Sequence, residues 1–426
     1  MENYTRNLSE IIFTVKPLLY LSKILGLAPI SINFFLQNEK TLSKKSIFKR
    51  SDRLYSCILV LFIAFSTVLV FINLFLNYLN GETDNNNMYF LDLLILGIAT
   101  IVNIAVCLLK FPGKIDKLFH KISLLGEYLN MKGNSFTKHA YFVRVQVCSV
   151  IVFYFILCII DAAIWYKHDY YWNLYVTIEG AFSLSSFIMV MQFVDFTLAI
   201  KKCIQEIYNS LVYCEFNDKN GLSKKQCKLL NKMYIFLDDP VNYRQNIFIS
   251  TNYQHSRTLH IWPCFPILRV LQDTVCDISS LVNSLYGLQI LTLFLTNFIQ
   301  ITSNFNFLII QIMSASKLDF WKLALSTDSI LWSIVHFVML LCIAMSCNSA
   351  SKESEITAEL LQKLLLLPQI KQITAAEIQQ FIQQVIIRKI QFTAYDFFVL
   401  DHKILVSVIG AVTTLLVIIA QFQYST

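Results

Sequence analysis

The chain has 426 residues, of which 56% are hydrophobic and only 15% are charged. An ordinary soluble domain carries about 25% charged residues, so this chain has too few charges to cover its apolar surface in water. The composition therefore excludes a soluble enzyme, a nucleic-acid-binding protein and a disordered chain, and it indicates a membrane protein. The net charge of +7 can be interpreted only once its location along the chain is known.

Seven stretches are long and apolar enough to cross a membrane, which requires roughly 20 residues of helix. Six of them carry no charged residue, whereas the fourth contains Glu179 and Asp195. The predicted spans, in chain order, are residues 54–79, 93–109, 145–160, about 172–200, 285–313, 329–346 and 404–422. We therefore expect an all-α membrane protein with seven transmembrane helices.

The distribution of lysine and arginine predicts the orientation of these spans. Of the 35 basic residues, 31 lie in the N-terminal segment and in the connections after spans 2, 4 and 6, and three lie in the other connections. Basic residues concentrate on the cytoplasmic side of a membrane protein. We expect a cytoplasmic N-terminus, an extracellular C-terminus and a multi-pass protein of the plasma membrane. The start, residues 1–23, has no continuous apolar core, so no signal peptide is expected.

The cytoplasmic connections are expected to form a helical anchor region. The connection after span 4 is too long for a bare loop, so helices 4 and 5 should extend beyond the membrane. The connection after span 6 contains two amphipathic patterns, about 351–367 and 374–391, which should pack on other helices or lie on the membrane surface. The expected segments are 1–53 (cytoplasmic), 54–200 (spans 1 to 4), 201–284 (extensions of helices 4 and 5), 285–346 (spans 5 and 6), 347–403 (cytoplasmic amphipathic helices), 404–422 (span 7) and 423–426 (extracellular tail).

An interfacial or cytosolic helix is also expected at residues 24–36, which are too short to span and contain Pro29.

Span 7 carries a stripe of small and polar residues on one helical face. Its members recur at alternating intervals of four and three: Ser407, Ala411, Thr414, Ile418 and Gln421. Such a stripe is either a packing face that lets helices approach closely or the wall of a pore. In the second interpretation Ile418 forms a hydrophobic constriction. One helix encloses a pore only if several copies of the chain assemble around it.

Span 5 carries a second stripe, made of the amides Asn297, Gln300, Asn304 and Gln311. These side chains serve either hydrogen bonds between helices or a polar wall for a ligand, and the two interpretations remain equal here. In the second interpretation Asn304 and Gln311 lie toward the outside.

Acidic and aromatic residues gather near the outer ends of the spans. Acids inside spans are costly and usually line a wet cavity. The aromatic residues form either the belt of a membrane interface or, with the acids, a pocket for a small organic molecule. The candidate pocket residues are Asp92, Asp161, Trp165, Tyr166, Tyr175, Glu179, Asn304, Gln311 and Trp332.

Motifs of enzymes and metal sites are missing from the sequence. His255, His260 and Cys264 lack a regular metal-ligand spacing, and there is no P-loop and no nucleophile elbow. None of the cysteines falls in the predicted outer connections, so no extracellular disulfide can form within the chain. We expect no catalytic residues, no cofactor, no metal and no nucleic-acid partner.

The C-terminal end resembles the insect gustatory receptor family. That family ends its last helix with Thr-Tyr, five apolar residues and Gln-Phe. Here Thr414 and Leu415 are followed by LVIIA and then by Gln421 and Phe422, so leucine replaces the tyrosine. The preceding residues 392–414, the segment of Cys347 with 350–368, and the N-terminal stretch 15–30 are also similar to the family.

The resemblance implies a ligand-gated, non-selective cation channel that is opened by a small-molecule tastant. It implies a homo- or hetero-tetramer with other gustatory receptors, held together by the cytoplasmic helices and embedded in membrane lipid. The last helix would line the pore with Ser407, Ala411, Thr414, Ile418, Gln421 and Phe422. Gln421 and Phe422 would lie at or near the outer gate, with Ile418 one turn below.

The sugar-sensing branch of the family carries glutamate where this chain has Leu416, so we expect a receptor for bitter or plant compounds. A fructose-type receptor is the alternative within the family. A seven-helix G-protein-coupled receptor is the alternative from another class, but its N-terminus lies outside, which the charge distribution opposes.

Overall fold

The computed structural model describes residues 18–27, 50–79, 86–111, 113–128, 133–165, 170–216, 264–313, 320–366 and 372–425, with only the backbone described at some helix ends. These residues are almost entirely helical and contain no strand, only an isolated bridge between Thr393 and Val399. The named helices are α2 (Arg50–Leu79), α3 (Asn86–Lys110), α4 (Lys114–Tyr128), α5 (Gly133–Trp165), α6 (Tyr170–Phe216), α8 (Cys264–Met313), α9 (Phe320–Leu365), α10 (Gln372–Ile387) and α11 (His402–Ser425).

Seven of these helices are long and apolar enough to cross a membrane: α2, α3, α5, α6, α8, α9 and α11. Each contains one of the seven predicted spans, so the all-α, seven-span fold is confirmed. Three of them, α6, α8 and α9, have 47, 50 and 46 residues and are more than twice as long as a membrane crossing requires. They continue without a break well beyond the apolar segments that predicted them.

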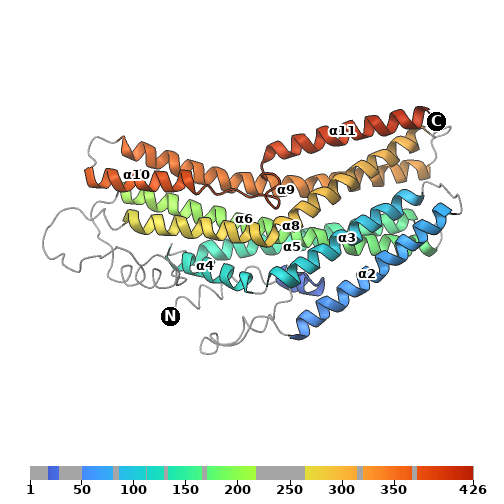
Figure 1. The fold of residues 1–426 in the computed structure, drawn as a ribbon, viewed down its shortest axis with the longest axis horizontal. Coiled ribbons are helices and arrows are strands. Elements are labelled where there is room, and N and C mark those ends of the chain that lie inside the picture. Colours follow the sequence, from blue (N-terminus) through green and yellow to red (C-terminus); the bar gives the residue numbers. More distant parts are fainter. Residues whose placement is uncertain are drawn as a thin grey trace.

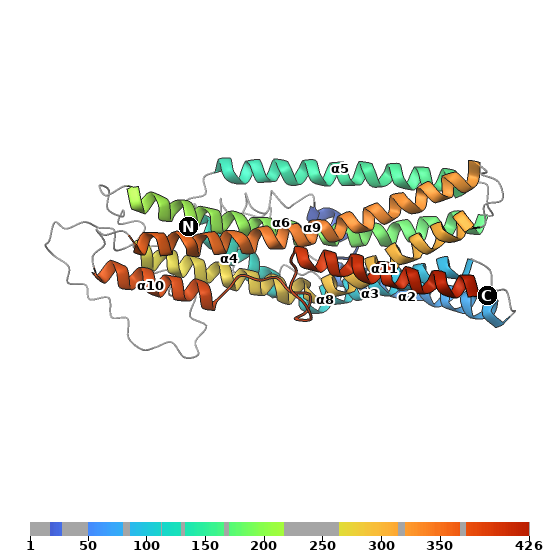
Figure 2. The same cartoon turned by 90° about the horizontal axis from the view of Figure 1, so that it is seen from above.

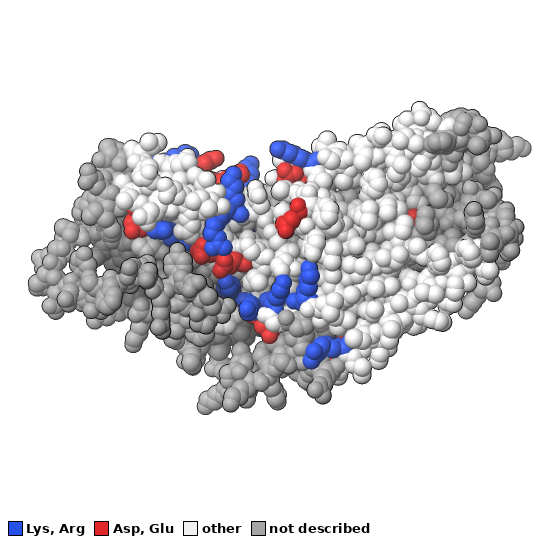
Figure 3. Space-filling model, viewed as in Figure 1, with Lys and Arg blue, Asp and Glu red and all other residues white. Residues whose placement is uncertain are grey.

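The long helices connect an apolar half of the molecule to a polar half (Figure 1). In the apolar half they are joined by α2, α3, α5 and α11, and in the polar half by α4 and α10, as the view from above also shows (Figure 2). Charged side chains gather over the middle and the polar half, while the face of the apolar half seen in Figure 3 is almost free of them. This division is the one expected of a bundle that stands partly in lipid.

The centre of the bundle is formed by α6, α8 and α9. Ile188 and Ile204 of α6 and Ile290 of α8 are fully buried, which is typical of helices covered on several sides. The outer helices α2, α5 and α11 bury far less of their apolar surface. In a single chain this surface is left for lipid or for another copy of the protein.

One helix that was expected to be separate is the lower part of α9. The pattern from about 351 predicted a new amphipathic helix, but α9 runs unbroken from Phe320 to Leu365. The residues around Ser346 and Ser351 interrupt the hydropathy of the sequence, but none of them breaks a helical backbone. The buried side chains of Leu361 and Leu364 lie on the predicted apolar face.

The second amphipathic helix, α10, ends at Ile387, a few residues before the predicted end. Its side chains Ile378, Phe381 and Val385 are buried, whereas Ile386, which continues the same apolar spacing in the sequence, is 49% exposed. Of the helix expected at 24–36, the residues from 28 onward lie outside the described part of the chain.

The sequence analysis missed α4. Its buried face consists of Ile115, Leu118, Ile122 and Leu125, each at most 5% exposed. The spacing of three, four and three residues is a regular amphipathic signal, so the sequence itself contains the pattern of this helix.

Candidate ligand site and pore helix

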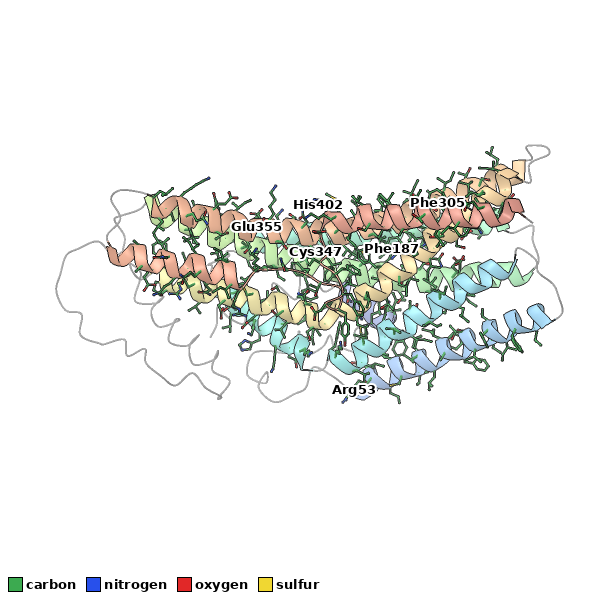
Figure 4. All side chains as sticks on the ribbon, turned by 45° about the horizontal axis from the view of Figure 1, so that its top comes forward. Arg53, Phe187, Phe305, Cys347, Glu355 and His402 are labelled. Carbon is green, nitrogen blue, oxygen red and sulfur yellow. The ribbon has the colours of Figure 1, made fainter. Side chains whose placement is uncertain are left out.

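An aromatic cluster joins α5, α6 and α9 inside the apolar half. The ring of Tyr154 is 4% exposed, and its centroid lies 5.8 Å from Phe187 and 6.2 Å from Trp332, both edge to face. Its hydroxyl donates to the carbonyl of Gly180 in α6. Figure 4 shows Phe187 among the helices near the middle of the molecule. Edge-to-face rings of this kind stabilise a packed site and offer aromatic faces to a ligand.

A buried polar pair continues this cluster on α9 and α8. The ring centroid of His336 lies 6.0 Å from that of Trp332, and its Nδ1 lies 2.8 Å from Oδ1 of Asn297. Since Nδ2 of Asn297 donates to the carbonyl of Leu293, its Oδ1 is the acceptor, and Nδ1 of His336 carries the proton in this arrangement. Both side chains are at most 4% exposed. His336 therefore places a hydrogen-bonding group beside the aromatic rings.

A second buried contact joins α3 to α8. The carboxylate of Asp92 is 6% exposed, and its Oδ2 accepts a hydrogen bond of 2.5 Å from the hydroxyl of Ser303. Gln300 reaches the backbone carbonyl of Asp92 at 3.5 Å, at the limit of a hydrogen bond. Asn297 and Gln300 thus take part in contacts between helices, which is the structural interpretation of the amide stripe. Asn304 and Gln311 of the same stripe are half-buried.

The other candidate acids lie near Tyr154. Asp161 on α5 is 7% exposed and Glu179 on α6 is half-buried, and both are close enough to act electrostatically on the Tyr154 hydroxyl. The structure thus brings together Asp161, Glu179 and Trp332 around a tyrosine, whereas Asp92 lies at the contact of α3 with α8.

Three further candidates cannot be compared with the structure, because the side chains of Trp165 and Tyr175 and the whole of Tyr166 lie outside the described residues.

Sequence reasoning missed Tyr154, Phe187 and His336. The signal for His336 was present, since it is the one histidine inside a predicted span. No pattern singled out Tyr154 or Phe187, because an aromatic residue in an apolar run is common and only the packing of α5 on α6 brings them together.

The polar stripe of α11 is exposed in the single chain. Ser407, Ala411, Thr414, Ile418 and Gln421 are all exposed, and the side chain of Phe422 is not described. The hydroxyl of Thr414 donates to the carbonyl of Gly410 in its own helix at 2.9 Å. The buried face of α11, with Leu405 and Val412 at 7% exposure, packs toward α8 and α9 instead. Packing within one chain therefore does not account for the stripe.

The described residues contain no group of three or more histidine, cysteine or acidic side chains that could hold a metal ion. His255 and His260 lie outside the described part of the chain.

Seven helices that are long and apolar enough to span a membrane define the class as a multi-pass membrane protein. The comparisons with known proteins agree with this class. Residues 15–426 match the family described as 7tm chemosensory receptor. The chain belongs to that family.

Individual relatives match shorter parts of the chain. Gustatory and pheromone receptor 32a of Drosophila melanogaster is 33% identical over 92 residues, which are 22% of this chain and 19% of the relative. Gustatory receptor 68a of the same organism is 29% identical over 148 residues, which are 34% of this chain and 37% of the relative. The matched segments thus span about a fifth to two fifths of the length of these relatives.

The fold is similar to a solved structure over nearly the whole chain. The insect olfactory receptor OR5 from Machilis hrabei, in complex with eugenol, matches with a TM-score of 0.57 and 14% identity over 96% of this chain and 97% of that chain. A second structure of the same receptor matches with a TM-score of 0.54 and 12% identity. At this identity the similarity concerns the fold.

Proposed function

We propose that the chain is a gustatory receptor that acts as a ligand-gated, non-selective cation channel. The observation that carries the proposal is the polar stripe of α11, which is exposed on an otherwise apolar outer helix. In lipid such a stripe is costly unless it faces water or another protein chain. Four copies of the chain, identical or combined with other gustatory receptors, would place it around a central aqueous path.

The pore would be narrowest toward the C-terminal end of α11. Ile418 would form a hydrophobic ring and Gln421 a polar ring one turn further on, with Phe422 beside it. Ile418→Ala and Gln421→Ala should then change the basal or the ligand-evoked current. Ile409→Ala is the matched control, because Ile409 is 50% exposed but lies on the opposite face of α11. Equal currents for all variants at the cell surface would contradict the assignment of α11.

The ligand would bind at the aromatic and polar cluster of α5, α6 and α9. Tyr154 and Trp332 offer aromatic faces, and His336, Asp161 and Glu179 offer groups that orient a small organic molecule. A ligand opens the channel only if it binds the open state more tightly than the closed state. Trp332→Leu should therefore raise the half-maximal ligand concentration, while Trp332→Phe keeps a ring and should change it less.

The relatives named as gustatory receptors support a tastant as the ligand. The class favoured is bitter or plant compounds, with fructose-type sugars as the alternative. The test is calcium imaging of cells that express the chain, with a panel of both classes. A calcium signal that requires a G protein, or the absence of any ligand-evoked current through the membrane, would contradict the proposal.

We also infer that the N-terminus is cytoplasmic and the C-terminus extracellular. The support is the distribution of basic residues, 31 of 35 of which lie on one side of the predicted spans. An antibody should reach a C-terminal tag on intact cells and an N-terminal tag only after permeabilisation. The opposite staining would show that the orientation is reversed.

A further inference from the structure

The connector, residues 388–401, joins α10 to α11 and is bound along one face of α8. Sγ of Cys276 donates to the carbonyl of Arg388 at 3.2 Å. Two turns further along α8, Asn283 donates through Nδ2 to the carbonyl of Gln391 at 2.7 Å and accepts the amide of Thr393 at 3.4 Å. The connector is therefore held to α8 by specific bonds over much of its length, which is unusual for an open loop.

The middle of the connector is a tight turn with an uncommon backbone. Tyr395 and Asp396 have φ values of 51° and 62°, in the left-handed region that non-glycine residues rarely adopt. The turn is closed by a hydrogen bond of 2.8 Å from the amide of Leu400 to the carbonyl of Phe392. The hydroxyl of Thr393 adds a bond of 2.9 Å to the carboxylate of Asp396. Such conformations persist only where the surroundings hold them, and they often mark a functional contact.

The turn is pressed against α8 at Gly287. A Cβ atom at this position would lie 3.1 Å from the backbone nitrogen of Tyr395 and 3.3 Å from its Cα. These distances are shorter than ordinary van der Waals contacts, and the atoms that would be displaced belong to the backbone. Glycine is therefore the residue that allows the helix and the turn to approach this closely.

The half-exposed ring of Tyr395 also contacts the end of α3. Lys110 is the last residue of α3, and its Nζ lies 5.0 Å from the centroid of the Tyr395 ring, within the range of a cation–π interaction. Lys114, at the start of α4, donates to the hydroxyl of Ser284 on α8 at 2.5 Å. The turn thus contacts α8 at Gly287 and α3 at Lys110, while Lys114 ties the neighbouring start of α4 to α8.

The first residues of α11, which we call the foot of the helix and which begin at His402, follow this turn closely. Oδ1 of Asp401 accepts the amides of Lys403 at 2.9 Å and of Ile404 at 3.3 Å, and so caps the helix that begins at His402 (labelled in Figure 4). Only a few residues separate the cap from Tyr395. A movement of the turn is therefore expected to reach the first residues of α11.

Of the two helices that contact the turn, α8 also contacts the candidate ligand cluster, and it is joined to α3 by a buried hydrogen bond. α3 and α8 meet at the bond between Asp92 and Ser303, and α8 meets α9 at the pair of Asn297 and His336. Asn297 lies ten residues from Gly287 along an unbroken helix, which is about 15 Å. A shift of α8 against α3 near Asn297 would therefore be transmitted along the helix to Gly287 and the turn.

We propose that Lys110, Gly287 and Tyr395 form a positioning contact that sets the foot of α11 relative to α3 and α8. Through this contact a rearrangement at the candidate ligand site is passed to the pore helix. The second part rests on the proposed function, because it requires α11 to line the pore. The first part concerns only the position of α11 and can be measured without any current.

The first test is hydrogen exchange of the amides of residues 402–408 in the full-length protein in lipid nanodiscs. Lys110→Met and Tyr395→Leu should each raise the exchange rate about two- to fivefold, the equivalent of the roughly 0.5–1 kcal/mol of an exposed cation–π contact. The double variant should exchange no faster than either single variant, because both remove the same interaction. Tyr395→Phe keeps the ring and should behave as the wild type.

The matched control is Lys117→Met, which removes an exposed lysine of α4. Unchanged exchange rates in Lys110→Met and Tyr395→Leu would overturn the positioning contact. So would an increase in the double variant equal to the product of the two single increases. A rate that rises equally in Lys117→Met would assign the effect to charge alone and would also overturn it.

The second test is the ligand-evoked current of the same variants at equal surface expression. Lys110→Met and Tyr395→Leu should each shift the half-maximal ligand concentration or the maximal current, and the double variant should show no larger shift. Tyr395→Phe and Lys117→Met should leave both quantities unchanged. Faster exchange together with unchanged gating would overturn the transmission to the pore. If the wild type conducts no current, the proposed function fails, while the exchange experiment still decides whether the contact positions α11.

Discussion

Arg388 is the centre of a charged network that fixes the end of α10 to α8. Its guanidinium binds Oδ1 of Asp273 and, at 2.7 Å, Oδ1 of Asp277. Lys121 of α4 reaches the other oxygen of Asp277 at 2.6 Å. Burial lowers the pKa of Arg388, but the hydrogen bonds that its guanidinium donates to Asp277 and Asp273 outweigh burial and raise the pKa above its usual value. The guanidinium therefore stays charged at all relevant pH values.

Replacing Arg388 by methionine should destabilise the fold by about 1–2 kcal/mol. A hydrogen bond between charged groups contributes about 1.5–3 kcal/mol when it is shielded from water. These side chains are 39%, 44% and 30% exposed, so the value for each pair falls to about 1 kcal/mol or less. Asp273 and Asp277, four residues apart on one helix, then lose the partner they share and add about 0.2–0.5 kcal/mol of repulsion.

The assay is thermal unfolding of the purified protein at low and high salt. Arg388→Met should lower the melting temperature by a few degrees, and high salt should reduce the difference from the wild type. Lys389→Met is the control, since Lys389 is the exposed neighbour. Adding Asp273→Asn to Arg388→Met should restore part of the loss, because it relieves the repulsion. An effect of Arg388→Met no larger than that of Lys389→Met would refute the reasoning.

Two further predictions concern the packing of α4 and of α2. Burial, with a smaller effect of Lys121, lowers the pKa of His120 below its usual 6.5, although its backbone hydrogen bond raises it. The folded state thus favours the neutral ring of His120. The neutral ring stabilises the fold above pH 6.5, and this stabilisation is lost as the pH falls. His120→Gln should therefore lose less thermal stability than the wild type between about pH 7 and about pH 5.5, and an equal loss would contradict this. A Cβ at Gly97 of α3 would clash with the methyl group of Thr67 on α2. Gly97→Ala should therefore destabilise the fold by about 1–3 kcal/mol, measured by thermal unfolding. Adding Thr67→Ala should restore most of the lost stability.

The spans were predictable because a membrane helix needs a long run of apolar residues, and hydropathy detects such runs directly. The continuity of α9 was not predictable, because the polar residues around Ser346 lower the hydropathy without breaking the helix. The helix α4 was not predicted either, although its apolar residues recur at helical spacing, because it is short and carries several charges.

The candidate site was predictable only in part. Trp332, Asp161 and Glu179 were candidates because acids inside spans are costly and aromatic residues gather at the same level, and the structure brings them toward one tyrosine. Tyr154 itself was missed, since nothing in one sequence tells which faces of α5, α6 and α9 meet. The contact of Gly287 with Tyr395 was equally hidden, because it joins residues 108 positions apart through the docking of a loop on a helix.

The central claim is that α11 lines the path of cations. The most direct measurement is the ratio of calcium to sodium permeability, from the reversal potential of the ligand-evoked current, in Gln421→Glu and Gln421→Lys. A ring of glutamates should raise the ratio above that of the wild type, and a ring of lysines should lower it or abolish the current. Ile409→Glu, with its acid on the opposite face of the same helix, should not raise the ratio. Permeability ratios that remain equal in the wild type and in both Gln421 variants, with all proteins at the cell surface, would contradict the claim.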